Sequence, residues 1–396
     1  MEAKNGAYIV SSVRTAVGKA HRGTLRHVRP EEMGAVVIRE AVQRVAGLDV
    51  NDIDDVLIGC AMPEGPQGMN MGRIVALKAG LPEEVPGATI NRFCSSGLQT
   101  IVLASQAIAT GQADCIVAGG TESMSMVPMS GFHFHPDPDV AVEAPEVYIS
   151  MGNTAENLVE KYEVSREEQD RFSFQSHRRA LDAIENGRFD EEIVPFDVED
   201  VFFREGHTHT VKKTFGMDEG PRADTSMEAL ARLRPVFRRG GSVTAGNSSQ
   251  LSDGAAAAVV MSERMMNELG VEPMGRILGF ALAGVAPEIM GIGPVGAIEK
   301  VLKRTGLTLQ DIGLVELNEA FAAQALAVIN EVGLDEAIVN VNGGAIALGH
   351  PLGCTGAKLT ATLLHEMKRR GVRYGLCTMC IGGGMGAAAV IENMTL

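Results

Sequence analysis

The sequence contains no tryptophan, and aromatic residues make up only 4% of its 396 residues. The interior must therefore be built mainly from Ala, Val, Ile, Leu and Met, small side chains that allow backbones to approach closely. Only six cysteines occur in this long chain, and no apolar run approaches membrane-spanning length. We therefore expect reduced thiols, no disulfide framework and no integral membrane segment.

Positive charge is also scarce, since the formal net charge is −15. A polyanion would be repelled over most of such a surface, so nucleic acid is not an expected partner. The N-terminal stretch "MEAKNGAYIVSSVRTAVGK" lacks the apolar core of a signal peptide and the Arg-rich character of a transit peptide. The sequence therefore favours a cytoplasmic protein, in which a local basic patch could still bind a small anion.

Glycine is abundant, and apolar runs bounded by Gly or Asp alternate with longer helical patterns. Runs such as "DDVLIGC" and "DCIVAGG" predict buried strands, whereas "AKLTATLLHEMKRRG" predicts a helix. This alternation is typical of an α/β fold. The length predicts two or three domains.

An internal repeat refines this prediction. "VIREAVQRVAGLDVNDIDDVLIGC" (37–60) parallels "AIEKVLKRTGLTLQDIGLVELNE" (297–319), with a helix, a turn and a buried strand in each. We expect two related halves, and loops that carry Cys94, His350 and Cys380 would then converge on one site. The predicted parts are a first half (1–120 plus 247–270), an inserted loop domain (121–246) and a second half (271–396).

Cys94, in "NRFCSSGLQT", lies between a β-biased run and a helical run. At a helix N-terminus, free N–H groups and the helix dipole lower a thiol pKa, so we expect a reactive thiolate there. Judged alone, a single cysteine is more often a small buried hydrophobe.

Three other motifs contain polar or reactive residues. His350 lies in the glycine-rich "NGGAIALGHPLGCTGAK", where there is little bulk for it to pack against. Asn318, in "ELNEAFAAQALA", is at a predicted strand–helix boundary, where it could be a helix cap or could orient a catalytic water or histidine. Cys377 and Cys380, in "CTMCIGGGMG", have the spacing of a zinc or dithiol site, but no second ligand pair lies nearby.

In this order and spacing, "NRFCSSG", "NEAFA", "GGAIALGHPLG" and "CIGGGMG" resemble the thiolase family over essentially the whole chain. The resemblance implies a layered αβαβα fold of two similar halves with an inserted loop domain. It implies that Cys94 is the acyl-accepting nucleophile, His350 the acceptor of its proton, and Cys380 the acid/base at the substrate α-carbon. One oxyanion hole would comprise His350 and a water held by Asn318, and the other the N–H groups of Cys94 and Gly382.

The resemblance also implies coenzyme A as a co-substrate, with no tightly bound cofactor and no metal. The family pattern assigns its contacts to Met151, Arg222, Ser249, Met290, Ala320 and Phe321. Two positions depart from the pattern of many acetoacetyl-specific relatives. Those relatives carry His where this chain has Ser150, and Ser where it has Ala229. "HFHPDPD", with His133 and His135, is interpreted as loop surface or an oligomer contact rather than a metal site.

"RFCSSGLQ" and "GNSSQLSDGA" favour a degradative 3-ketoacyl-CoA thiolase over the alternative, a biosynthetic acetoacetyl-CoA thiolase. Two further alternatives are a ketoacyl synthase-type condensing enzyme, which pairs its Cys with two His or with His and Asn, and a non-enzymatic CxxC redox or zinc protein. The family implies a homodimer or homotetramer, and a hydratase/dehydrogenase partner is compatible with it.

Overall fold

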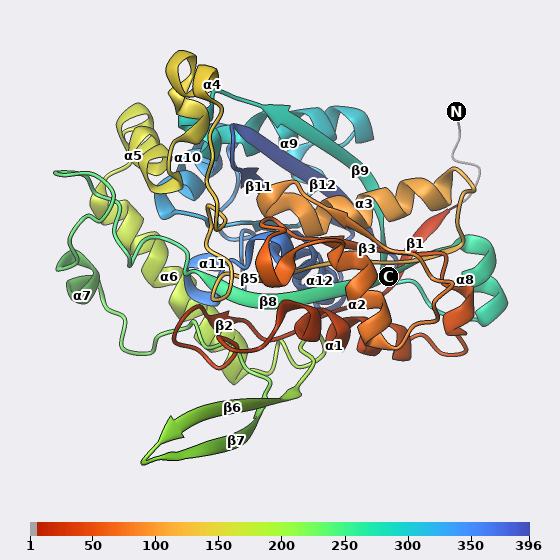
Figure 1. The fold of residues 1–396 in the computed structure, drawn as a ribbon. Coiled ribbons are helices and arrows are strands. Elements are labelled where there is room, and N and C mark those ends of the chain that lie inside the picture. The colour runs from red at the N-terminus through yellow and green to blue at the C-terminus, as the bar shows by residue number, and fades with distance from the viewer. Residues whose placement is uncertain (1–5) are drawn as a thin grey trace.

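The structure, a computed structural model, describes residues 6–396, apart from the side chains of residues 200 and 204. One ten-stranded sheet runs through the described part of the chain (Figure 1). Its strands, in spatial order, are β10 (Leu314–Leu317), β11 (Tyr374–Ile381), β12 (Met385–Asn393), β9 (Gly275–Gly284), β1 (Ala7–Arg14), β8 (Ser252–Ser262), β5 (Cys115–Ser123), β3 (Asp55–Gly59) and β4 (Ala88–Ile90), with β2 (Gly18–Lys19) on β8.

The sheet consists of two halves with the same topology. In the first, β3 is parallel to β5, which is antiparallel to β8, which is antiparallel to β1. In the second, β10, β11, β12 and β9 repeat that sequence of orientations. Within residues 6–396, β1 and β9 are joined at the single pair Ile9–Gly275. The predicted repeat is confirmed, because α1 (Pro30–Gln43), a 3₁₀ turn and β3 correspond to α9 (Gly293–Thr305), a 3₁₀ turn and β10.

The helices complete a five-layer αβαβα arrangement, as predicted. α1 and α2 (Met71–Ala79) cover the outer face of the first half, and α9 and α10 (Ala322–Val332) lie on the outer side of the second. Between the halves, α3 (Ser96–Ala109) and α12 (Leu352–Arg370) pack on each other and on strands of both halves. The layer that both halves share is therefore made of two buried helices.

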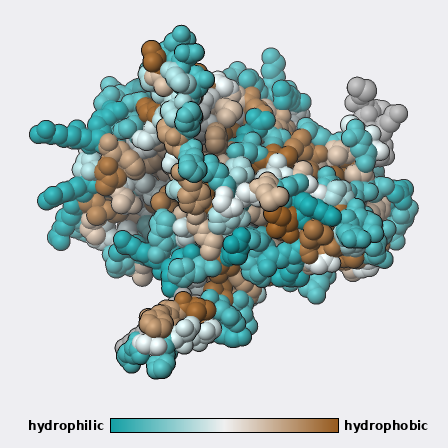
Figure 2. All heavy atoms as spheres, in the orientation of Figure 1, coloured by the Kyte–Doolittle hydropathy of each residue, from teal (hydrophilic) through white to brown (hydrophobic). Residues whose placement is uncertain are grey.

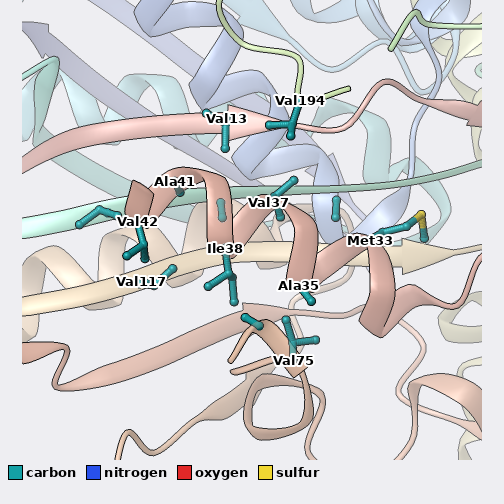
Figure 3. Close-up of a cluster of buried hydrophobic side chains, with 14 of the residues drawn as sticks. Val13, Met33, Ala35, Val37, Ile38, Ala41, Val42, Val75, Val117 and Val194 are labelled. Carbon is teal, nitrogen blue, oxygen red and sulfur yellow. The ribbon is translucent and has the colours of Figure 1, made fainter. Parts of the chain in front are cut away.

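The core under α1 shows how the sequence produces this packing. Pro30 at the first helical position and two acidic residues in the first turn favour helix initiation. Buried apolar residues then recur at helical spacing and pack against Val117 of β5 and Val75 of α2 (Figure 3). Burial of such side chains from water is the main stabilising contribution of this layer.

Two glycines allow α3 and α12 to approach closely. A Cβ on Gly356 would lie 2.3 Å from the Leu98 nitrogen, and a Cβ on Gly97 would lie 2.7 Å from the Ala357 nitrogen. A larger residue at either position would require the helices to separate. This contact holds the N-terminal ends of the two helices side by side.

The segment between β5 and β8 contains the predicted charged helix, observed as α6 (Arg166–Glu185) behind a capping box at Ser165. It also contains α4 (Pro138–Glu143), α5 (Met151–Tyr162), α7 (Met227–Ala231) and the two-stranded sheet β6 (Phe196–Arg204) and β7 (His207–Phe215). β5 continues three residues past the predicted 120/121 boundary, to Ser123. The division into three domains itself stays a prediction.

The β6–β7 hairpin projects from the body of the molecule (Figure 1), and hydrophobic side chains are visible on it (Figure 2). Its base is fixed to β1 by a buried ion network. Arg14 pairs with Glu192 at 2.6 Å and with Asp218 at 2.8 Å, just before and just after the hairpin. The remaining helices are α8 (Glu263–Leu269) and α11 (Ala345–Leu348). Within the described residues, no helix is both long enough and apolar enough to cross a membrane.

Candidate active site

A cavity of about 470 Å³ brings together the three predicted reactive residues, Cys94, His350 and Cys380. Five of the six predicted coenzyme A contacts also line it, namely Met151, Ser249, Met290, Ala320 and Phe321. The rest of the lining is largely apolar and includes Met124, Met129, Phe237 and Leu352. A larger groove beside α1 and α2, of about 650 Å³, has no thiol, imidazole or hydroxyl group among its lining residues.

Cys94 lies in the 3₁₀ turn Phe93–Ser95, directly before α3, as the sequence predicted. The turn is held by its own side chains. Asn91 accepts the Phe93 N–H at 2.9 Å, while Ser96 accepts the Arg92 N–H at 2.9 Å and donates to the Phe93 carbonyl at 2.7 Å. Phe93 has a positive φ of 43°, a conformation uncommon for a bulky residue.

The predicted lowering of the Cys94 pKa is wrong. Burial raises the pKa of this thiol to about 12, although the backbone N–H groups of Gly382 and of Cys94 itself donate to the sulfur and favour the thiolate. Ala61, Met124 and Leu352 form an apolar cluster against Cys94. Desolvation therefore outweighs the effect of the helix N-terminus, so Cys94 at rest is a thiol, and a nucleophilic role would require a base.

His350 is that candidate base. It is buried just before α12, and its Nδ1 lies 2.6 Å from Thr355 Oγ1, while its Nε2 lies 3.3 Å from Asn318 Nδ2. Burial, together with the positive charge of Lys358, lowers the His350 pKa to about 3. The imidazole is therefore neutral at physiological pH and has a lone pair that can accept a proton.

Asn318 follows β10, and its N–H donates to the Thr378 carbonyl at 3.0 Å. It is not the cap of α10, because that position belongs to Phe321. Its Nδ2 faces His350, and its buried Oδ1 has no protein partner among the described residues. The prediction that Asn318 orients a water or a histidine is therefore favoured over the cap interpretation.

Cys377 and Cys380 lie on β11, but three residues apart on a strand they point to opposite faces. Cys377 packs in the central layer, whereas Cys380 packs with Met290, Ala320 and Phe321 at the cavity. Both thiols are free, and no described group of three or more His, Cys, Asp or Glu residues could hold a metal ion. Because the two thiols lie on opposite faces of β11, they cannot form a shared zinc or dithiol site.

The Cys380 pKa is raised well above its ordinary value, first by burial and then by the neighbouring Cys94 thiol. Gly382 follows in the turn between β11 and β12, where Gly383 and Gly384 have φ values of 79° and 85° that favour glycine. A Cβ on Gly384 would lie 2.3 Å from the Val285 carbonyl oxygen. The glycine run thus forms the tight turn that directs the Gly382 N–H at Cys94.

Arg222 is the predicted coenzyme A contact that does not line the cavity. Its side chain is exposed and pairs with Asp224 at 3.0 Å, and its backbone N–H donates to His177 Nδ1 at 3.3 Å. Ser150 lines the cavity, whereas Ala229 is exposed on α7 and does not. His133 and His135 are exposed in a loop, and neither lines the cavity.

Sequence reasoning missed two polar residues around the site. Thr355 contacts His350, and the buried Glu122 carboxylate accepts the N–H groups of Ala61 at 2.7 Å and Gly353 at 2.8 Å. Glu122 thereby joins β5, the loop after β3 and the start of α12. The sequence signal that could have identified Glu122 is a carboxylate at the end of the apolar strand "CIVAGGTES".

Comparison with known proteins identifies the family. Residues 7–264 match the thiolase N-terminal domain, and residues 271–393 match the thiolase C-terminal domain. The chain belongs to the thiolase family. A 3-ketoacyl-CoA thiolase of Bacillus subtilis (strain 168) is 55% identical over 387 residues, which cover 98% of this chain and 99% of that protein.

Two solved structures share the thiolase fold. The Bacillus anthracis acetyl-CoA acetyltransferase gives a TM-score of 0.89 at 44% identity, covering 99% of this chain and 100% of that one. Human mitochondrial 3-ketoacyl-CoA thiolase gives a TM-score of 0.88 at 39% sequence identity. The match covers 98% of this chain and 99% of that one. This thiolase is therefore an acyltransferase, and the resemblance to the family is confirmed over the condensing-synthase and CxxC alternatives.

Proposed function

We propose that the protein cleaves 3-ketoacyl-CoA with coenzyme A, giving acetyl-CoA and a shortened acyl-CoA, through an acyl group on Cys94. One observation carries the proposal: a thiol, a neutral imidazole and a second thiol line a single apolar cavity. These are the nucleophile, base and acid that carbon–carbon thiolysis requires.

The first half-reaction breaks the C2–C3 bond of the substrate. His350 takes the Cys94 proton, and the thiolate sulfur bonds to the C3 carbonyl carbon. The C2–C3 electron pair leaves as the enolate of acetyl-CoA, and Cys380 gives its proton to C2. Acetyl-CoA departs, leaving an acyl-Cys94 thioester, a Cys380 thiolate and a protonated His350.

The second half-reaction returns every group to its starting state. The coenzyme A thiol gives its proton to Cys380, and its sulfur bonds to the acyl carbon. The Cys94–acyl bond breaks, and Cys94 recovers its proton from His350. Charge on the two carbonyl oxygens is stabilised by the N–H groups of Cys94 and Gly382, and by His350 with a water on Asn318, whose Oδ1 can accept from it.

Coenzyme A is a substrate here rather than a resident cofactor. We place its pantetheine arm along Met151, Ser249, Met290, Ala320 and Phe321, the cavity side on which Cys380 lies. We assign Arg222 to the phosphate groups of coenzyme A, which would lie outside the cavity. Its exposed guanidinium would leave the Asp224 carboxylate and pair with a phosphate, which is more highly charged.

We further propose the degradative direction, as in fatty acid β-oxidation, in a cytoplasmic homo-oligomer. The motifs "RFCSSGLQ" and "GNSSQLSDGA" and the 55% identity to a protein named 3-ketoacyl-CoA thiolase support it. The name of the Bacillus anthracis structure favours the alternative, acetoacetyl-CoA synthesis. Relative kcat/KM for 3-ketoacyl-CoA chains of about 4 to about 16 carbons distinguishes the two, since a biosynthetic enzyme would accept only the shortest.

The assignment of roles is tested by two rates measured on Cys380→Ser. Acyl exchange between thioesters needs only Cys94 and His350, because no proton moves at carbon and coenzyme A can leave and return as a thiolate, so Cys380 never becomes the thiolate that takes a proton in thiolysis. Thiolysis of acetoacetyl-CoA also needs Cys380, so we expect it to fall by roughly 10²–10⁴-fold while exchange of labelled coenzyme A into acetyl-CoA persists.

Cys377→Ser is the matched control, because it makes the same change on the other face of β11, and both rates should stay near wild type. Intact-mass and peptide analysis should find the acyl group on Cys94. Equal loss of both rates in Cys380→Ser, or an acyl group on another cysteine, would contradict the assignment.

A further inference from the structure

Thr355 is a fully buried hydroxyl residue in the first turn of α12, and the thiolysis steps above do not use it. Its Oγ1 lies 2.6 Å from His350 Nδ1 and 3.0 Å from the Pro351 carbonyl oxygen. The backbone N–H of Thr355 also donates to that carbonyl at 2.9 Å. The start of α12 therefore fixes Oγ1 beside the imidazole.

One arrangement of protons satisfies both contacts of Oγ1. If the single Thr355 hydroxyl proton is donated to the Pro351 carbonyl, which can only accept, Oγ1 accepts the Nδ1–H of His350. A neutral imidazole carries one N–H, which leaves Nε2 with a lone pair, and the donor Asn318 Nδ2 faces that atom at 3.3 Å.

The other tautomer would break two of these contacts. Thr355 would have to turn its proton to Nδ1, which would remove the hydroxyl from the Pro351 carbonyl. Nε2 would carry a proton toward the Asn318 amide nitrogen, so that amide would have to flip. Without that flip, Nε2–H and Asn318 Nδ2 would be two buried donors facing each other, which is costly.

We propose that Thr355 is a positioning residue that fixes His350 in the Nδ1–H tautomer and so keeps Nε2 free to take the Cys94 proton. The inference rests on the proposed role of His350 as the base. After proton transfer both ring nitrogens carry hydrogen. Thr355 still accepts from Nδ1, and Nε2–H is left for the developing oxyanion, because Asn318 Nδ2 cannot accept it. Because a hydroxyl is uncharged, it orients the ring without stabilising a resting imidazolium.

The test uses Thr355→Val, which keeps the shape of the side chain and removes the acceptor. We expect kcat for thiolysis to fall about 10- to 100-fold, because Nδ1–H would be left without an acceptor. The KM for coenzyme A should change little. Thr355→Ser restores the oxygen and should return most of kcat. Thr360→Val is the matched control, because Thr360 is equally buried one turn later and donates to the Gly356 carbonyl at 2.8 Å without touching His350.

A second readout reports the tautomer directly. In protein carrying ¹⁵N-histidine, long-range ¹H–¹⁵N spectra of the wild type near pH 7 should show His350 protonated at Nδ1, with its signal identified by its loss in His350→Gln. Thr355→Val should show a mixture of tautomers or the Nε2–H form. Nε2–H in the wild type would overturn the inference even if Thr355→Val fails to fold.

The two hypotheses fail in different ways. Wild-type thiolysis by His350→Gln would remove His350 as the base, and the proposed role with it. If His350→Gln is inactive while Thr355→Val keeps both wild-type kcat and the Nδ1–H tautomer, the base assignment stands and Thr355 has no positioning role.

Discussion

At the scale of single residues, burial decides the protonation state of the three reactive groups. Burial raises the pKa of Cys94 and Cys380 and lowers that of His350, so all three are uncharged at neutral pH. An apolar cavity cannot stabilise a resting thiolate–imidazolium pair at low cost. Charge therefore develops only when a substrate brings the carbonyl oxygens that the N–H groups of Cys94 and Gly382 can stabilise.

This view predicts the pH dependence of alkylation at Cys94. With a pKa of about 12, the thiolate fraction rises tenfold per pH unit and reaches no plateau below about pH 10. The iodoacetamide rate constant, followed by peptide mass, should therefore increase linearly on a logarithmic scale from about pH 7 to about pH 10. The other five cysteines are buried, so Cys94→Ala should remove the fast-labelled site.

A different profile would contradict the assignment of a resting thiol. A rate that is constant from about pH 6 to about pH 9 would mean that Cys94 is already a thiolate paired with a charged His350. The urea-unfolded protein provides the reference, because its exposed thiols should level off near their ordinary pKa of about 8.5.

At the scale of elements, the crossing of α3 and α12 sets the distance between the proposed nucleophile and the proposed base. Each helix has one of these two residues just before its first turn, and Gly97 and Gly356 allow the helix backbones to approach. Glu122 reinforces the arrangement by accepting the N–H of Gly353 at the start of α12. Neither helix could shift along the other without moving Cys94 away from His350.

Gly356→Ala should therefore reduce both stability and activity. The added methyl would meet the Leu98 backbone nitrogen, and overpacking of this kind typically costs about 1–3 kcal/mol. We expect a lower midpoint of urea unfolding and a lower kcat. Gly296→Ala, within α9, is the control, because its methyl would meet only Ala283 Cβ at 3.2 Å and should change kcat little. Equal effects of the two substitutions would show that the helix crossing has no special role.

The residues that the structure brings together at the cavity belong to local motifs, whereas the errors concern surroundings that only the fold creates. "NRFCSSG" and "CIGGGMG" were sufficient to select Cys94 and Cys380, and the repeat was sufficient to predict that their loops converge. The prediction of a lowered Cys94 pKa was wrong because the sequence shows the adjacent helix N-terminus but does not show that Met124 and Leu352 pack against the sulfur and desolvate it. Thr355 was missed because its contact with His350 depends on where α12 begins.

At the scale of the whole molecule, one surface beside the sheet edge is unusually apolar. Met69 is 93% exposed, and Asn70 next to it donates to the Gly87 carbonyl at 2.7 Å, directly before the edge strand β4. Phe132 is 52% exposed and lies over Gly65 in the same loop. An edge strand with one side open for pairing, beside exposed apolar side chains, is typical of an interface.

We therefore expect at least a dimer by sedimentation at micromolar concentration, with this surface in the contact. Met69→Glu should raise the dimer dissociation constant at least about tenfold, because twofold symmetry places two new charges in one interface. Phe203→Glu on the β6–β7 hairpin is the comparison, as it changes an equally apolar exposed side chain far from β4 and should leave the dimer intact. A monomeric wild type would refute the prediction.

The order in which the site residues occur along the chain has a consequence for biosynthesis. Ribosomes release Cys94 early, whereas His350, Cys380 and the strand β12, which pairs with both β11 and β9, are translated much later. A nascent or prematurely terminated polypeptide thus carries the proposed nucleophile without its proposed base and acid and without the Gly382 N–H. Translation must pass β12 before the proposed acylation of Cys94 has all of its groups, so shorter products should not consume thioesters.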